Sequence, residues 1–291
     1  MRSVTAAALG DGDGRGCEAS DFLCGLGGRL HGLLPGGGGD VAIAVIKVVA
    51  VASFAMLNAA AMVFVWRRLM AFFQDRLGPN RVGFAGTLQV VADGIKLVLK
   101  EVIIPRRADR VMFLLAPVLV VVPFLLVYSV VPFGPTAAVA DLGIGVLFVF
   151  AVTSLTFPGV FLAGWSSNSK YAVIGAMRAI AQLLAFAVPL LLSALGVVVL
   201  AGSLSLSRIV TAQENVWFVL PQALGAGVFL VAAMAENAAH PFDLPEAESE
   251  IVAGYSTEYS GMAFGLFYVA EFGTTFSIGA VFATLFLGGW R

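Results

Sequence analysis

The sequence predicts an all-α polytopic membrane protein, and three observations lead to that fold class. The chain has 291 residues, of which 59% are hydrophobic and only 12% are charged. A soluble globular protein carries about twice that charged fraction. The hydrophobic residues are collected into six long runs, and the charges gather between them. This pattern excludes a disordered tail protein, a nucleic-acid binder and an ordinary cytosolic enzyme.

Each of the six runs is long enough to cross a hydrocarbon core, which takes about 20 helical residues. The runs are continuous and lack the alternation of barrel strands, so we expect transmembrane helices. We expect a flexible, glycine-rich tail at residues 1–40 and a single transmembrane bundle at residues 41–291. The predicted spans are residues 41–66, 111–133, 142–165, 172–201, 216–235 and 261–290.

The loop after the first span carries nine basic residues, whereas the loops on the opposite side hold only Arg208. Because lysine and arginine concentrate in cytoplasmic loops, we expect the first and last of the long loops in the cytoplasm and the tail outside. Within the first loop, apolar residues from Leu88 to Val102 recur at helical spacing, with polar residues between them. This pattern predicts an amphipathic helix in the plane of the membrane interface.

The loop before the last span is acidic. Residues 236–258 contain six acids and neither lysine nor arginine. Glu246 and Glu250 are four residues apart, which places them on one face of a helix beginning near Pro245. Two interpretations stay open: a solvated acidic loop, or an acidic group that faces a cavity or the basic first loop.

Charged residues also occur inside the spans. Lys47 and Arg178 lie near span ends, where long side chains reach the interface. Glu271 is eleven residues into its run, and a charge at the bilayer centre costs roughly 2.5–3.5 kcal/mol on insertion scales. We therefore expect Glu271 to face protein or water, either as a proton-relay group or in a structural hydrogen bond. Cys17 and Cys24 are too few for a zinc or iron–sulfur site, so we expect no metal bound by this chain.

Four motifs resemble one known family. They are QDRLGPNRVG at residues 74–83, WSSNSKY with RAIAQ at 165–182, HPFDLPEAESE with EYSG at 240–261, and LFLGGW at 285–290. In this order they resemble the H subunit (subunit 1) of bacterial respiratory complex I, the proton-translocating NADH–quinone oxidoreductase. The resemblance runs from about residue 55 to the end of the chain.

The resemblance implies a membrane subunit that is not catalytic alone. It implies a chain that helps form the quinone chamber where the membrane arm meets the redox arm. Quinone would be the substrate, and FMN and the iron–sulfur clusters would belong to partner subunits. This chain itself would lie in the cell membrane beside other membrane and peripheral subunits. The implied chamber residues are Arg67, Asp93, Lys96, Glu246, Glu248 and Glu250, and the implied proton path contains Glu236 and Glu271.

The chain departs from the family pattern at several points. Trp66 and Ala187 stand where the family has glutamates, and Ala239 stands where it has an arginine. The family continues through two more helices after the position of Arg291, which favours a truncated or divergent member. A homologous subunit of an energy-converting hydrogenase or other dehydrogenase, and a free-standing transporter, remain alternatives. The full RLGPNRVG motif favours complex I over the first alternative. An inverted repeat would favour the transporter, and residues 41–165 and 172–290 show no convincing similarity.

Overall fold

The computed structural model describes residues 38–134, 140–239, 241–245 and 248–291. The predicted tail up to residue 37, Cys17, Cys24 and Glu246 lie outside this part of the chain, as does the side chain of Glu248. The chain divides into two compact units, residues 1–49 and 50–291. The boundary falls within α2 (Gly38–Phe73), whose first turns are all that is described of the first unit.

All the regular secondary structure in the described residues of the second unit is helical, which confirms the predicted fold class. After α2 come α3 (Gln89–Leu99), α4 (Arg110–Val130), α5 (Gly145–Thr153), α6 (Thr156–Ser166), α7 (Lys170–Ala201), α8 (Leu206–Ala212), α9 (Ala223–Glu236), α10 (Glu248–Ile251) and α11 (Gly261–Phe286). Short 3₁₀ turns occupy Phe84–Gly86 and Gly254–Ser256. The helix predicted in the first loop is α3, and four of its apolar residues, Val91, Ile95, Val98 and Leu99, are exposed.

Five segments are long and apolar enough to cross a membrane: Val45–Phe73, Arg110–Val130, Gly145–Ser166, Lys170–Ala201 and Gly261–Phe286. They correspond to five of the six predicted spans. In place of the remaining predicted span, residues 216–235, the structure has the shorter helix α9, which is 14 residues long. At 1.5 Å per residue α9 is about 21 Å long, less than the roughly 30 Å of a hydrocarbon core. The residues before it, 213–222, form turns and bends.

The third predicted span consists of two helices, α5 and α6, separated by a turn at Ser154 and Leu155. Pro158 explains the interruption, because proline has no N–H to donate to the carbonyl of Ser154 four residues earlier. That carbonyl instead accepts from the Phe157 N–H at 3.2 Å, in the tighter spacing of a 3₁₀ turn.

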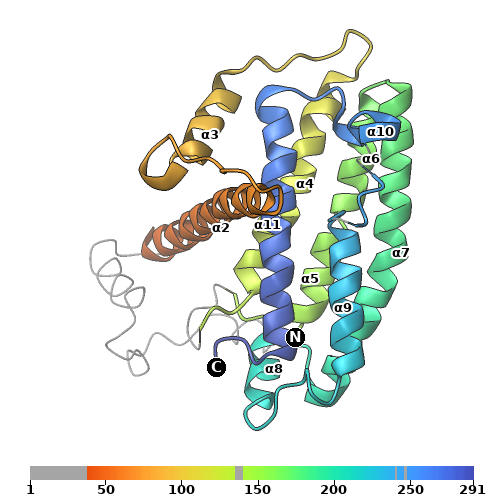
Figure 1. The fold of residues 1–291 in the computed structure, drawn as a ribbon. Coiled ribbons are helices and arrows are strands. Elements are labelled where there is room, and N and C mark those ends of the chain that lie inside the picture. The colour runs from red at the N-terminus through yellow and green to blue at the C-terminus, as the bar shows by residue number, and fades with distance from the viewer. Residues whose placement is uncertain (1–37, 135–139, 240, 246–247) are drawn as a thin grey trace. The chain divides into compact units, whose positions relative to one another are not determined.

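The helices of the second unit pack around two clusters of buried side chains. Figure 1 shows α4, α6, α7, α9 and α11 running alongside one another, and α4 packs on α6 and α11 while α7 packs on α6 and α9. One cluster includes Val197, Ile209 and Phe229, and the other includes Phe113 and Phe124. Small residues allow the close approach of α6 and α7: a Cβ on Gly164 would lie 2.4 Å from that of Ala176.

Candidate functional site

A cavity lies where the two buried clusters meet. Its walls come from α4, α6, α7, α11 and the ends of α5 and α9, together with Pro245 and Tyr255 of the acidic loop. About 890 Å³ of space is not filled by protein atoms, including the part open to the outside. The walls are mostly apolar, with side chains such as Phe124, Phe157 and Leu183. An apolar space of this kind with a few polar groups is typical of a small-molecule site.

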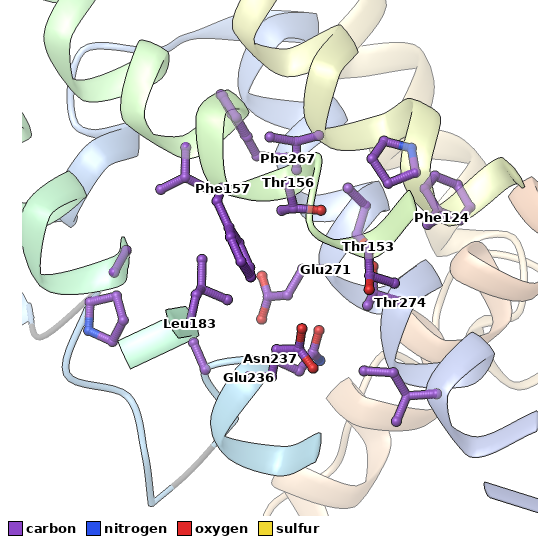
Figure 2. A pocket seen from close by; sticks show the side chains of 18 of the residues that line it. Phe124, Thr153, Thr156, Phe157, Leu183, Glu236, Asn237, Phe267, Glu271 and Thr274 are labelled. Atoms are coloured by element: carbon purple, nitrogen blue, oxygen red, sulfur yellow. The ribbon is translucent and has the colours of Figure 1, made fainter. Parts of the chain in front are cut away.

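Two carboxyl groups enter this cavity from different helices. Glu236 is the last residue of α9, and Glu271 lies in the first half of α11. Figure 2 shows both carboxyl groups directed into the same space. The two helices are joined beside them: the side-chain amide of Asn237 donates to the Thr275 hydroxyl, which donates to the Glu271 carbonyl at 3.0 Å. The end of α9 is therefore tied to α11 next to both acids.

Gln182 of α7 links the cavity wall to the acidic loop. Its Nε2 donates to the carbonyl oxygens of Ala235 and Phe242, each at 2.7 Å. Its Oε1 is buried and accepts no hydrogen bond from the described residues. Buried polar atoms usually have a partner, so this acceptor marks a place in the cavity for a water or ligand that donates a hydrogen bond.

The acidic loop is held against α7 by charge and by close packing. Arg178 donates to Glu250 at 2.6 Å, although both side chains remain partly exposed. One turn earlier, Gly175 lets the loop backbone at Gly254 approach so closely that a Cβ would lie 2.6 Å from it. Of the acids in this loop, for which a solvated loop and a group facing a cavity or the basic first loop were both open, Glu250 pairs with Arg178 of α7.

A third polar group joins α2 and α3. Arg67 donates to Asp93, which also accepts from Gln89 at 3.0 Å. Partial burial raises the pKa of Asp93, but the hydrogen bonds from Gln89 and Arg67 and the charges of Arg67 and Lys96 outweigh it, so the pKa lies below its ordinary value of 3.8. Asp93 is therefore a carboxylate at neutral pH.

Comparison with known proteins identifies the family. The model of the NADH dehydrogenase family matches residues 46–291. The chain is 52% identical over 240 residues to the H subunit of the NADH-quinone oxidoreductase of Dehalococcoides mccartyi (strain CBDB1), which covers 82% of this chain and 68% of the relative. The chain belongs to this H-subunit family. It is also 50% identical over 226 residues to the corresponding H subunit of Bacillus thuringiensis (strain Al Hakam), covering 77% and 68% of the two chains.

Membership of the H-subunit family confirms the resemblance carried by the four motifs. The relatives are named as subunits of an oxidoreductase. Together with the long apolar helices, family membership makes this chain a multi-pass membrane protein of a multi-subunit complex.

The residues predicted for the site fall in three places. Glu236 and Glu271 share the cavity, Glu250 pairs with Arg178, and Arg67 with Asp93 and Lys96 lies on α2 and α3. Sequence reasoning gave no role to Gln182, which belongs to the RAIAQ motif, nor to Asn237. The motif at residues 165–182 was a signal for Gln182, but its two carbonyl partners lie 53 and 60 residues away in the chain.

Proposed function

We propose that this chain is the membrane subunit of a proton-translocating NADH–quinone oxidoreductase that helps form the quinone chamber and links quinone reduction to proton translocation. The observation that supports this most is the apolar cavity with Glu236 and Glu271 directed into it. The names of the relatives support the same reaction over a hydrogenase subunit or a free-standing transporter.

The quinone would have an apolar space for its tail and polar groups near its head. The aromatic and aliphatic walls of the cavity suit the tail. The Oε1 of Gln182, which accepts no hydrogen bond within the described part of the chain, suits a hydroxyl donor such as a quinol or a water. Arg67, Asp93 and Lys96 on one side and the acidic loop from Glu246 through Glu248 to Glu250 on the other would border the chamber.

The two cavity acids would carry the proton path inward. Reduction of a quinone to a quinol takes up two protons, so neighbouring carboxyl groups experience a change of charge and of proton demand. A carboxyl group within a membrane span is by default a candidate for proton relay. Glu236, at the end of α9, would respond first to this change of charge, and Glu271, on α11, would respond next.

The other parts of the reaction would come from partner subunits. FMN and iron–sulfur clusters would lie in those subunits, and the isolated chain would not catalyse the reaction. The tail would lie outside the cell membrane, while the basic first loop and the acidic last loop would lie in the cytoplasm.

The departures from the family pattern suggest weaker coupling. Trp66 packs edge-on against Phe272, the residue after Glu271, with ring centroids 6.4 Å apart. Neither Trp66 nor Ala187 carries a titratable proton. A complex built on this subunit is therefore expected to pump fewer protons per electron than a complex with glutamates at both positions, and equal ratios would contradict this expectation.

The test uses the assembled complex in membrane vesicles with Glu236→Gln and Glu271→Gln. We expect each variant to lose roughly tenfold or more of its coupled quinone reductase activity, in line with loss of a proton-transfer group. Glu214→Gln is the matched control, because Glu214 lies outside the cavity and pairs with Arg291. NADH oxidation and proton uptake are measured together. If both cavity variants keep full reductase and pumping activity, the proposed proton path is wrong.

A further inference from the structure

Four basic residues lie in two neighbouring turns, one where α4 begins and one where α6 gives way to α7. The turn before α4 is fastened to the turn before α7 by two hydrogen bonds: the Asp109 N–H donates to the Ser166 carbonyl at 3.2 Å, and the Asn168 side chain donates to the Arg107 carbonyl at 3.3 Å. These bonds bring together the basic turn cluster, which comprises Arg106, Arg107, Arg110 and Lys170.

Among the described residues, the basic turn cluster carries positive charge that no ion pair offsets. None of the four side chains has an ion pair with any residue that the structure describes. Residues 105–110 and 166–171 hold four cations and one carboxylate, a net charge of +3. That carboxylate, Asp109, caps α4 by accepting from the N–H groups of Val111 and Met112.

Two of the four cations occupy positions that a helix by itself disfavours. Arg110 is the first residue of α4 and Lys170 is the first residue of α7. The N-terminal end of a helix carries partial positive charge, so a cation there is repelled and an anion is attracted. An anion placed between the two helix starts would therefore interact favourably with both backbones and with the side chains.

The exposed residues around the basic turn cluster are of the types found beside a lipid headgroup and its acyl chains. Trp165, at the end of α6, and Tyr171, at the start of α7, are 54% and 56% exposed. Exposed tryptophan and tyrosine at the ends of spans are typical of the headgroup level. One turn further into the spans, the exposed side chains are apolar, among them Leu114, Phe161 and Ile174.

We propose that the basic turn cluster binds the phosphate headgroup of an anionic phospholipid, whose acyl chains lie against α4, α6 and α7. Guanidinium groups hydrogen-bond phosphate oxygens in pairs, which suits three arginines at one turn. An acidic protein surface would need only the cations, whereas a lipid also uses the exposed aromatic pair and the apolar side chains beyond it. This proposal is independent of the proposed quinone chemistry.

The first experiment locates the lipid on the unmodified complex. The assembled complex is illuminated with phosphatidylglycerol that carries a photoreactive acyl chain, and with the matching phosphatidylcholine as control. We expect phosphatidylglycerol to label the segment 161–174 and residues 111–118 in preference to phosphatidylcholine. Equal labelling by the two lipids, or labelling only elsewhere on the chain, would overturn the proposal.

The second experiment compares two pairs of substitutions with the same change of charge. The test pair is Arg106→Gln with Lys170→Gln, and the control pair is Arg76→Gln with Arg81→Gln, in the segment between α2 and α3. Phosphatidylglycerol retained by the purified complex is counted by mass spectrometry. Each basic residue near an anionic surface contributes about a fivefold factor, so we expect roughly 25-fold weaker retention for the test pair. Equal retention by both pairs, or loss of a partner subunit instead of lipid from the test pair, would refute the lipid site.

Discussion

Gly175 offers a direct test of how the acidic loop is held. In Gly175→Ala, the new Cβ would lie 2.6 Å from the backbone carbon of Gly254, whereas ordinary contacts begin at 3.4 Å. The loop and α7 must therefore separate by 0.8 Å, the difference between these two distances, to restore an ordinary contact. Overpacking of this kind costs about 1–3 kcal/mol, and the better helix propensity of alanine returns up to about 1 kcal/mol.

The matched control is Gly279→Ala in α11. Gly279 is helical, and no atom of the residues that the structure describes lies within 4 Å of the position that its Cβ would take. This variant gains helix propensity without overpacking, so the two variants should differ by about 1–3 kcal/mol. The assay is the midpoint temperature at which the assembled complex is lost, followed beside quinone reductase activity. We expect Gly175→Ala to lower both and Gly279→Ala to lower neither. If Gly175→Ala is as stable and active as the control, the close approach of loop and helix is not what fixes the acidic loop.

Three further predictions concern the polar groups. Substituting Arg178 and Glu250 by glutamine, singly and together, should reveal a coupling of only about 0.2–1 kcal/mol in a double-mutant cycle, because both side chains are partly exposed. Since the pKa of Asp93 is lowered in the folded protein, its contribution to stability is present above its unfolded pKa and is lost as pH falls through the folded value. In Asp93→Asn, stability should therefore depend less on pH below about pH 4 than in the unmodified protein. Burial raises the pKa of Tyr259 to about 12, so its contribution to the stability of the fold is complete below about pH 10 and is lost as pH rises through 12. Because Tyr259→Phe removes the hydrogen bond to the Phe113 carbonyl, it should lower the stability measured by calorimetry at neutral pH by about 0.5–1.5 kcal/mol. The same substitution should remove the loss of stability at alkaline pH.

The helices were predictable because a transmembrane span can be recognised from its composition alone. A run of about 20 apolar residues has few alternatives in a membrane. The break between α5 and α6 follows from Pro158, and the sequence placed that proline inside the run without indicating whether the helix bends or stops. The shortening of the fifth prediction to α9 was harder to foresee, because residues 216–222 are as apolar as a span and yet form turns.

Pairings between distant residues were beyond the sequence. Arg178 was expected to reach the interface, and the structure pairs it with Glu250, 72 residues later. No periodicity connects positions so far apart. The same holds for Gln182, whose partners are backbone carbonyls and therefore leave no trace in side-chain types. The acids of the cavity were predicted one by one, but only the packing of α9 against α11 shows that they share a space.

The three polar groups differ in how strongly they would respond to a change of charge on a bound quinone. Charges in water-exposed positions are screened within about 8–10 Å at physiological salt. Arg67 with Asp93 and Arg178 with Glu250 are of this kind, since the side chains of both pairs are 38–55% exposed. The carboxyl groups of Glu236 and Glu271 face a cavity with mostly apolar walls, where electrostatic interactions are stronger. On the proposed function, coupling therefore runs through the cavity acids, and salt should weaken the contribution of the exposed pairs while leaving that of the cavity acids nearly unchanged.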